Sequence, residues 1–314
     1  MKIVITGGQG FLGQRLAKRL LNQTKIDIDE LTLIDVVKPV APNNDPRVNC
    51  FEMDLRHPKG LEKIIAAETD AIFHLAAIVS SHAEQDPDLG YEINFLATRN
   101  LLEICRQNNP KVRFVFSSSL AVFGGELPAV IQNDTAVTPQ STYGTQKAMS
   151  ELLINDYTRK GFVDGFCVRL PTICIRPGKP NKAASSFVSS IIREPLHGEQ
   201  AICPVSEDLR LWLSSPNTII ENFIHTLTLP SLLHSWHVIN LPGFTVSVKQ
   251  MLSDLAGIKG DQILENVKFE FDQNINNIVA SWPAEINCSQ ALALGFSVDQ
   301  NFKDVIHQFI QFDM

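Results

Sequence analysis

The chain has 314 residues, 44% of them hydrophobic and 19% charged, which is enough to bury a sizeable core in one large α/β domain or in two lobes. Its formal net charge of −7 and pI near 5.6 argue against a nucleic acid or an anionic membrane as partner. The six cysteines are scattered and form no C-x-x-C pair, so neither a disulfide framework nor a metal site is expected.

The first predicted element begins at Lys2, which leaves no room for a signal peptide. No apolar run reaches about 18 residues, the length at which a membrane-spanning helix becomes a candidate. We therefore expect a cytoplasmic protein without a membrane partner.

Short apolar, β-branched runs alternate with longer patterns of helical spacing up to residue 170. The expected strands are Lys2–Thr6, Leu31–Val36, Val48–Met53, Ala71–Leu75, Val112–Ser117 and Gly165–Leu170. The expected helices are Phe11–Asn22, Leu61–Ala67, Asp88–Gln107 and Thr142–Lys160. Such alternation is typical of crossover helices on a parallel sheet that is covered on both faces. The predicted fold class is α/β, a Rossmann-type doubly wound parallel sheet with a smaller C-terminal subdomain.

Five prolines between residues 171 and 204 interrupt the chain after Leu170, which predicts irregular loops and the start of the subdomain. We expect residues 1–170 to form the first domain and residues 171–314 mainly the second, with some segments returning to the first. Later runs predict strands at Trp236–Asn240 and Val267–Phe271, and helices at Ser289–Leu294 and Lys303–Gln311.

A glycine-rich turn follows the first predicted strand. Gly7, Gly10 and Gly13 have the form G-x-x-G-x-x-G, and Phe11 and Leu12 open the helix behind them. Glycines at these positions allow a tight turn and a close approach of backbone N–H groups to a pyrophosphate, above a helix N-terminus that favours negative charge. Because the motif stands between a strand and a helix, it predicts a dinucleotide site that includes all five residues.

Asp35 ends the second predicted strand, where an acidic side chain binds the ribose hydroxyls of a dinucleotide. A carboxylate would repel a 2′-phosphate and only Lys38 lies nearby, so NAD is favoured over NADP. The alternative is that Asp35 is a turn residue at the end of a strand.

Two further strand ends are candidates for cofactor contacts. Asp54 and Leu55 follow the third strand and are placed to reach the adenine edge, although Asp54 could instead cap a loop. Leu75-Ala76-Ala77 follows the fourth strand, where small residues let the backbone approach the cofactor. His74 is interpreted as a core histidine rather than a catalyst.

Tyr143 and Lys147 are four residues apart and therefore share one face of a helix. There the ammonium can lower the pKa of the phenol, normally about 10, and make the tyrosine a general acid or base. Upstream, Ser117 and Ser119 end the fifth predicted strand, where they should face the cofactor cleft. The alternative for Tyr143 and Lys147 is an incidental pair on a surface helix. The alternative for the serines is a loop whose backbone is hydrogen-bonded by its own serine side chains.

The chain resembles the extended short-chain dehydrogenases/reductases of the NAD-dependent epimerase/dehydratase group. The resemblance rests on residues 6–13, 35, 74–77, 94–100, 117–124 and 143–147. It implies that Tyr143 is the acid/base, that Ser119 orients the substrate, and that Lys147 tunes the tyrosine and binds the nicotinamide ribose. It also implies that Asn94 braces the loops around the cofactor.

Departures from the family pattern narrow the substrate. Phe123 stands where the family often has tyrosine, and Gln146 where it often has serine. Residues 169–182 lack the asparagine and the Tyr-Gly-Pro turn of nucleotide-sugar enzymes. Together with residues 210–213 and 291–296, this segment resembles the D-erythronate dehydrogenases of the same family, which implies a short sugar acid as substrate.

A carboxylate substrate needs a cationic anchor, and arginine provides a bidentate one. The cations of the predicted substrate lobe are Arg176, Lys179, Lys182, Arg193 and Arg210. Arg210 stands where nucleotide-sugar relatives bind a diphosphate, and Thr172 where they place a substrate-contacting asparagine. Ser80 and Ser81 are candidates for binding hydroxyls. For each cation the alternative is a solvated surface charge.

The predicted function is NAD-dependent oxidation of the C2 hydroxyl of a short aldonate, D-erythronate in the first place. The alternatives are a nucleotide-sugar epimerase or dehydratase that retains NAD, which residues 171–182 argue against, and a non-catalytic NAD(P)-sensing protein, which the Ser119, Tyr143 and Lys147 set makes improbable. The family resemblance further implies a homodimer that pairs through the helices at 88–107 and 142–160.

Overall fold

The computed structural model of the chain describes residues 1–57, 59–178, 184–231 and 237–314. The chain forms two compact units. Unit 1 consists of Met1–Ser119, Ser141–Arg169 and Ile220–Ile239, and unit 2 of Leu120–Gln140, Leu170–Ile219 and Asn240–Met314. The assignment of the cofactor to one domain and of the substrate to the other stays a prediction.

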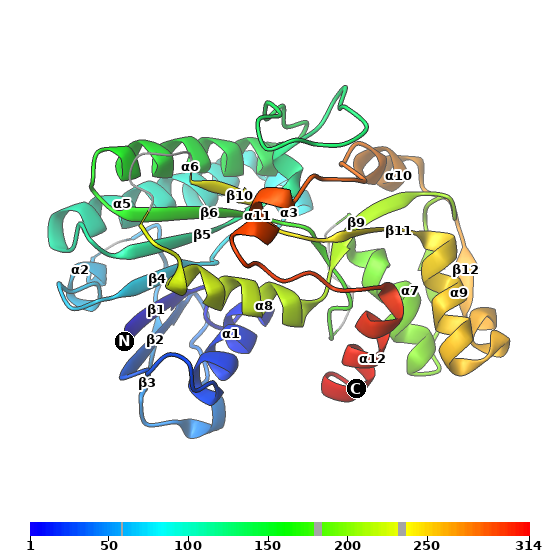
Figure 1. The fold of residues 1–314 in the computed structure, drawn as a ribbon, viewed down its shortest axis with the longest axis horizontal. Coiled ribbons are helices and arrows are strands. Elements are labelled where there is room, and N and C mark those ends of the chain that lie inside the picture. Colours follow the sequence, from blue (N-terminus) through cyan, green and yellow to red (C-terminus); the bar gives the residue numbers. More distant parts are fainter. Residues whose placement is uncertain (58, 179–183, 232–236) are drawn as a thin grey trace. The chain divides into compact units, whose positions relative to one another are not determined.

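Unit 1 is built on a parallel sheet (Figure 1). Over the described residues this sheet has seven strands in the order β10-β6-β5-β4-β1-β2-β3. They are β1 Lys2–Thr6, β2 Glu30–Asp35, β3 Val48–Glu52, β4 Ala71–His74, β5 Arg113–Ser119, β6 Asp164–Leu170 and β10 Val238–Asn240. The strands from β3 to β5 pair in parallel, and the strand order reverses where β4 lies beside β1. The predicted doubly wound α/β fold is confirmed.

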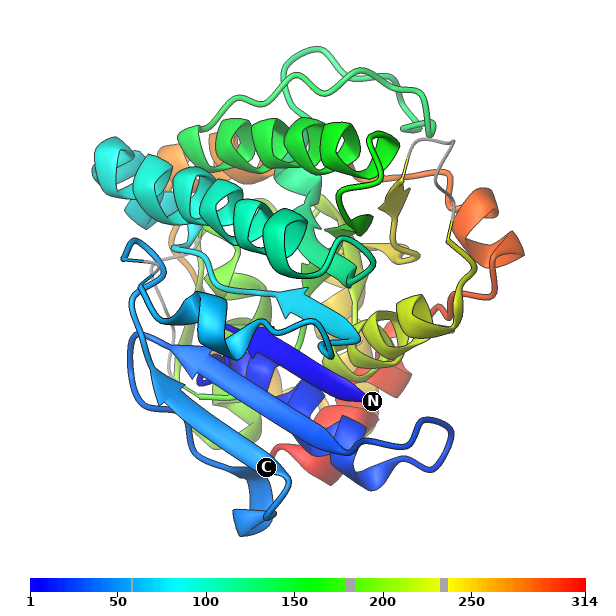
Figure 2. The ribbon, with the colours of Figure 1, turned by 90° about the vertical axis from the view of Figure 1, so that its left-hand side faces the viewer.

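Helices cover both faces of this sheet. On one face α5 (Ala97–Asn108) and α6 (Thr142–Arg159) lie side by side (Figure 2). The strand residues Ile72 and Phe114 share a core with the helical Leu101 and Ile154. On the other face lie α1 (Phe11–Asn22) and α8 (Pro216–His225), which are joined by an ion pair from Arg19 Nε to Glu221 Oε1 at 2.5 Å. The Phe73 and Phe223 rings meet edge to face there, with centroids 6.0 Å apart.

The helix predicted at Leu61–Ala67 is only one turn long, α2 at Leu61–Ile64. Its expected continuation is held in another conformation by side-chain amides at the end of α5. Asn108 Nδ2 donates to the Ile65 carbonyl oxygen at 2.9 Å, and Asn109 Nδ2 donates to the carbonyl oxygens of Ala67 and Thr69. These tertiary bonds leave no local signal in the sequence.

The helix predicted at Asp88–Gln107 is divided. It begins as α4 (Pro87–Gly90), widens into the π-helical segment η2 (Tyr91–Leu96), and continues as α5. Within η2 the Asn94 carbonyl oxygen accepts bonds from the hydroxyls of Thr98 at 3.0 Å and Ser150 at 3.2 Å. A short helix that was not predicted, α3 (Ser80–Gln85), precedes α4, and β5 runs two residues further than expected, to Ser119.

Over its described residues, unit 2 has two small sheets, with the strand orders β11-β9-β7 and β12-β8. Its strands are β7 Thr172–Ile173, β8 Ala201–Cys203, β9 Arg210–Ser214, β11 Phe244–Ser247 and β12 Val267–Phe269. Its helices are α7 Ser186–Leu196, α9 Val248–Lys259, α10 Gln273–Ala280, α11 Ser289–Ala293 and α12 Phe302–Phe312. In the part of the chain that the structure describes, the 3₁₀ turns are η1 Pro42–Asn44, η3 Leu120–Val122, η4 Thr226–Thr228 and η5 Asp261–Asn266.

The later predictions hold for β12, α11 and α12 within a few residues. The strand predicted at Trp236–Asn240 is β10 from Val238 onward, and Trp236 lies outside the described residues. The strands β7 to β9 and β11 and the helices α7 to α10 were not predicted. Strands of two to five residues are too short to show a period.

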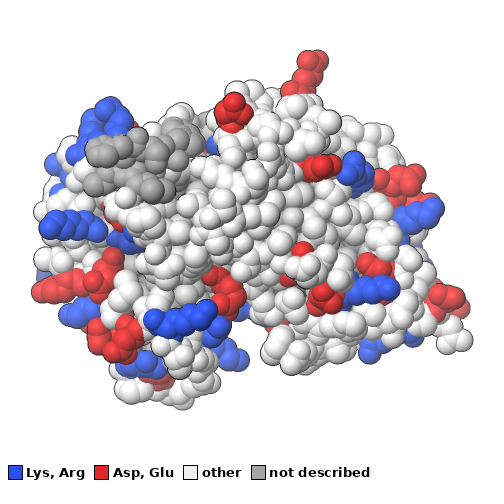
Figure 3. Space-filling view, in the orientation of Figure 1, with Lys and Arg blue, Asp and Glu red and all other residues white. Residues whose placement is uncertain are grey.

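Within the described ranges, no helix is both long and apolar enough to cross a bilayer. On the face drawn in Figure 3, acidic and basic side chains are interspersed rather than gathered by sign.

Candidate active site

The glycine turn between β1 and α1 has no room for larger residues. Gly7 has a φ of +73°, and a Cβ there would lie 2.8 Å from the Ala76 backbone nitrogen, at the end of β4. A Cβ on Gly13 would lie 2.2 Å from the Gly7 carbonyl oxygen. Gly8, which the motif analysis did not single out, is equally confined, because its Cβ would lie 2.8 Å from the Leu33 Cβ on β2.

The N-terminus of α1 suits a phosphate group. Gly10 is its N-cap, no side chain caps it among the described residues, and the first turn carries no acidic residue. The backbone N–H groups that open the helix are therefore available to a ligand, next to the positive end of the helix dipole. Phe11 and Leu12 lie in this first turn. The turn as built fits the pyrophosphate of NAD.

Asp35 lies beside the glycine turn. Its carboxylate accepts hydrogen bonds from the backbone nitrogens of Gln9 at 3.0 Å and Val36 at 2.7 Å. These bonds fix the acidic group of β2 beside the glycine turn of β1, as a ribose-binding residue requires. Gln9 was missed by sequence reasoning, because a backbone donor leaves no residue-type signal.

Asp54 closes the turn after β3. Its carboxylate forms an ion pair with Arg56 at 2.6 Å and accepts the Arg56 backbone N–H at 2.9 Å, which lowers the pKa of the carboxyl. This matches the loop-capping alternative. Leu55 is buried in the core of unit 1. Contact of either residue with adenine stays a prediction.

His74 is a core histidine, as expected. Its ring nitrogens bond to the hydroxyls of Thr6 at 2.6 Å and Thr98 at 2.9 Å. Burial lowers its pKa to about 3, so the ring is neutral. The next residues are Leu75-Ala76-Ala77. The first of them is bonded to the backbone of β1, because the Leu75 N–H donates to the Thr6 carbonyl oxygen at 3.1 Å.

Asn94 braces the loop after β4. Its Oδ1 accepts the Ile78 N–H at 2.9 Å, and its Nδ2 donates to the Ile78 carbonyl oxygen at 3.3 Å and to Gln146 Oε1 at 2.7 Å. Gln146, which stands where relatives often have serine, thus orients the asparagine. Gly90 leaves space for the Gln146 side chain, since a Cβ at residue 90 would lie 2.5 Å from Gln146 Nε2.

The end of β5 and the first turns of α6 meet at the predicted catalytic residues. The Ser141 side chain caps α6 by accepting the Gly144 N–H at 3.1 Å. Lys147 Nζ donates to the Ser117 carbonyl oxygen at 2.8 Å, and a hydrogen bond joins Ser119 to Tyr143. The structure therefore brings the three predicted catalytic residues together within unit 1.

The Lys147 ammonium is 1% exposed and lies 4.5 Å from the centroid of the Phe116 ring and 5.6 Å from that of Tyr143. Burial lowers its pKa to about 7, although Cys167 and Glu151 act in the opposite direction. The lysine can therefore gain or lose a proton near neutral pH.

The predicted fall in the pKa of Tyr143 is wrong for the protein without ligand. Burial raises the pKa of this phenol to about 12, and the hydrogen bond with Ser119 only partly offsets the rise. The physical reason is that Lys147 is itself desolvated and directs its Nζ to the Ser117 carbonyl oxygen. The two groups still lie near each other, with the Lys147 Nζ 5.6 Å from the centroid of the Tyr143 ring.

The candidate substrate residues occupy different settings. Ser80 begins α3 in unit 1, and the Ser81 hydroxyl is buried without a hydrogen-bond partner among the described residues. In unit 2, Thr172 is buried on β7, and Arg210 on β9 is 58% exposed in an ion pair with Glu285 at 3.3 Å. The predicted cations Lys179 and Lys182 lie outside the described residues.

Arg193, another predicted substrate cation, is already paired with groups of the protein itself. Its Nη2 pairs with Glu194 Oε1 at 2.5 Å, and its Nη1 donates to the Arg176 carbonyl oxygen at 2.6 Å. The Arg176 N–H donates to Ser189 Oγ at 3.0 Å. The Arg176 backbone is thus fixed on both sides, while its guanidinium has no ion pair or hydrogen bond within the described part of the chain.

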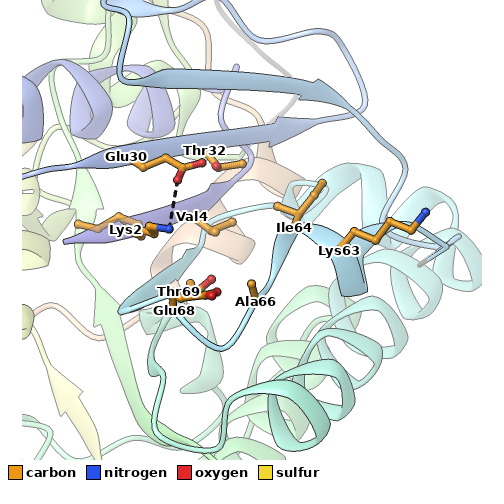
Figure 4. A pocket seen from close by; sticks show the side chains of 10 residues that line it. Lys2, Val4, Glu30, Thr32, Lys63, Ile64, Ala66, Glu68 and Thr69 are labelled. Atoms are coloured by element: carbon orange, nitrogen blue, oxygen red, sulfur yellow. Dashed lines mark ion pairs between the residues drawn. The ribbon is translucent and has the colours of Figure 1, made fainter.

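A pocket of about 220 Å³ lies at the amino-terminal edge of the unit 1 sheet (Figure 4). Lys2 and Glu30, which begin β1 and β2, form an ion pair of 3.8 Å beside it, and Thr69 precedes β4. In open α/β sheets ligands bind beyond the carboxyl ends of the strands. This pocket is therefore not part of the candidate site.

Residues 3–215 match the sequence profile of the NAD dependent epimerase/dehydratase family. The chain belongs to this family. Membership confirms the predicted resemblance to extended short-chain dehydrogenases/reductases and makes NAD the cofactor. The glycine turn and Asp35, which fit NAD in unit 1, agree with it.

Full-length relatives sharpen the comparison. The chain is 78% identical to a D-erythronate dehydrogenase of Haemophilus influenzae over all of both chains. It is 47% identical to a D-erythronate dehydrogenase of Cupriavidus necator, covering 99% of this chain and 98% of the other. A solved structure of a nucleoside-diphosphate-sugar epimerase from Agrobacterium tumefaciens matches with 39% identity and a TM-score of 0.95, over 100% of this chain and 94% of that one.

Gly13→Ala is expected to lower the free energy of unfolding by about 1–3 kcal/mol and to weaken NADH binding, because the new Cβ collides with the Gly7 carbonyl oxygen. Urea denaturation and NADH fluorescence measure the two effects. Gly257→Ala in α9 is the control, since its Cβ would lie 3.9 Å from the nearest atom. Equal behaviour of the two variants would contradict the packing argument.

Proposed function

We propose that this chain oxidises the C2 hydroxyl of D-erythronate to 2-dehydro-D-erythronate with NAD. The observation that carries the proposal is the 78% identity, over the full length of both chains, with a relative named D-erythronate dehydrogenase. The hydrogen bond between Ser119 and Tyr143, with the Lys147 ammonium 5.6 Å from the centroid of the Tyr143 ring, supplies the chemistry that such an oxidation needs. We also propose a cytoplasmic location, where such a dehydrogenase would meet its NAD and its small sugar acid.

In the proposed mechanism, Tyr143 takes the proton of the substrate hydroxyl. Bound NAD supplies the hydride acceptor. Because the pKa of Lys147 is about 7, its amine is partly neutral near neutral pH and can accept the proton of the Tyr143 phenol. One form of the singly protonated pair is a phenolate beside an ammonium, which is the general base that the reaction requires. Ser119 holds the hydroxyl oxygen toward this phenolate.

The cofactor residues act by binding. We propose that the first turn of α1 holds the pyrophosphate, that Asp35 binds the adenosine ribose, and that Lys147 binds the nicotinamide ribose. Ser117, whose hydroxyl donates to the His74 carbonyl oxygen at 3.1 Å, is proposed to line the same site. Asn94 supports it by bracing the loop after β4.

We propose Arg176 as the anchor of the substrate carboxylate. Its guanidinium has no partner among the described residues, whereas Arg210 is exposed and paired with Glu285. The planar guanidinium offers a carboxylate two donors in a preorganised, bidentate arrangement. Ser80, Thr172 and Lys182 remain candidates for the other oxygen atoms of the substrate.

The assay for this function follows NADH absorbance while NAD is offered with four-carbon aldonates and with nucleotide sugars. NADH is expected with D-erythronate, and Tyr143→Phe is expected to lower kcat by roughly 10²–10⁴ without loss of NADH binding. Conversion of a nucleotide sugar without net NADH would instead support an epimerase or dehydratase. Unimpaired turnover by Tyr143→Phe would contradict the mechanism.

Arg176→Met is expected to raise the KM for D-erythronate by about 10- to 100-fold, the value of a lost hydrogen bond to a charged group, with NADH affinity unchanged. Arg210→Met, measured in parallel, should change the KM by less than about twofold, as for an exposed ion pair. The reverse pattern would assign the carboxylate to Arg210.

We further propose a homodimer that pairs through α5, η2 and α6. Leu96 at the end of η2 is 45% exposed and Leu152 on α6 is 56% exposed, as expected for residues that a second copy covers. Leu152→Glu should convert the dimer to monomers in sedimentation velocity. Leu292→Glu, at a 45% exposed position in unit 2, is the control and should leave the mass unchanged. A parent protein that sediments as a monomer would contradict the proposal.

A further inference from the structure

One turn beyond Lys147 on α6, a buried carboxylate contacts the same serine run. Glu151 is 1% exposed, and its Oε1 accepts the Ser118 hydroxyl at 2.5 Å. Tyr143, Lys147 and Glu151 follow one another at intervals of four residues and thus share a helix face. Each of the three contacts a different one of the three serines that end β5, namely Ser119, Ser117 and Ser118.

Glu151 is also held from β6. Arg169, itself 5% exposed, donates from Nε to Oε1 at 2.9 Å and from Nη2 to Oε2 at 2.7 Å. This bidentate pair fixes the carboxylate in both position and orientation. A buried ion pair is weak evidence for stability, because its desolvation cost offsets its attraction. Its placement one turn from the catalytic lysine points to another role.

Several titratable groups surround the Lys147 ammonium, and their charges decide which of them favours its protonated form. The titratable groups that act on it from α6, β4 and β6 are Tyr143, Glu151, His74 and Cys167, and Arg169 lies beyond them against Glu151. His74 is neutral, and burial keeps the pKa of the Cys167 thiol well above its usual range. Glu151 is therefore the carboxylate among these groups that favours the protonated lysine.

We propose that Glu151, clamped by Ser118 and Arg169, is a positioning residue that fixes α6 against the end of β5 and favours the ammonium form of Lys147 beside Tyr143. It touches neither substrate nor cofactor in this account. The role belongs to the proton-handling pair and does not depend on which alcohol is oxidised.

The main test is Glu151→Gln. Loss of the negative charge should disfavour the phenolate–ammonium form of the pair and lower kcat about tenfold. It should also move the acid limb of the kcat–pH profile to lower pH by about one unit, because the pKa of Lys147 falls. An unchanged limb in a folded Glu151→Gln protein would overturn the proposal.

The matched control is Asp164→Asn, which removes the carboxylate partner of Arg113 in another largely buried ion pair of unit 1. It should lower the thermal stability and leave the acid limb in place. If both variants move the limb equally, the effect is general destabilisation and the proposal fails.

A second readout needs no substrate. The ¹³Cε resonance of Lys147, assigned by its absence in Lys147→Arg, should titrate near pH 7 in the parent protein and about one unit lower in Glu151→Gln. A parent that makes no NADH from D-erythronate would disprove the proposed function and leave this titration informative. Should Glu151→Gln not fold, Glu151→Asp withdraws the charge by one methylene and should give a smaller shift in the same direction. No shift would overturn the proposal.

Discussion

Burying one ammonium group between the sheet and the helix that crosses it is the constraint on which the catalytic end of unit 1 depends. Lys147 Nζ donates to the Ser117 carbonyl oxygen at 2.8 Å, and the Phe116 ring centroid lies 4.5 Å away. A buried ammonium is costly unless such partners are present. These contacts hold α6 on the end of β5, and the same docking brings Tyr143 to Ser119.

The constraint reaches the cofactor turn through a continuous set of hydrogen bonds. The Ser117 hydroxyl donates to the His74 carbonyl oxygen at 3.1 Å, and the His74 ring bonds to Thr6 at 2.6 Å. Thr6 ends β1 immediately before Gly7. The predicted catalytic residues and the turn that fits NAD are thus parts of one hydrogen-bonded frame, which suits the proposed reaction, in which proton and hydride leave the same carbinol.

Local patterns in the sequence predict the cofactor turn and the Ser119, Tyr143 and Lys147 set. Each of these patterns lies within one local element. The glycines lie in a turn, Asp35 lies at a strand end, and the Tyr143–Lys147 spacing lies on one helix face. Glu151 was not found, because it lies on α6 and its partner Arg169 lies on β6, and no local spacing links the two residues. The pKa of Tyr143 was predicted in the wrong direction, since spacing shows a neighbouring charge but not its burial.

Similar limits applied to the fold and to the choice of cation. The helix at Leu61–Ala67 was too long in the prediction because Asn108 and Asn109 bind its backbone from α5. Family position pointed to Arg210 among the cations, whereas the proposal of Arg176 rests on the exposure and the ion pair of Arg210, which composition does not give.

The most direct test of the account follows the fate of the hydrogen at C2. D-erythronate carrying deuterium at C2 should transfer it to C4 of the nicotinamide, one deuterium for each NADH formed, while the hydroxyl proton passes to Tyr143 and on to solvent. Mass spectrometry of the isolated NADH measures this transfer. Deuterium released to solvent, or kept in a product formed without net NADH, would contradict the account.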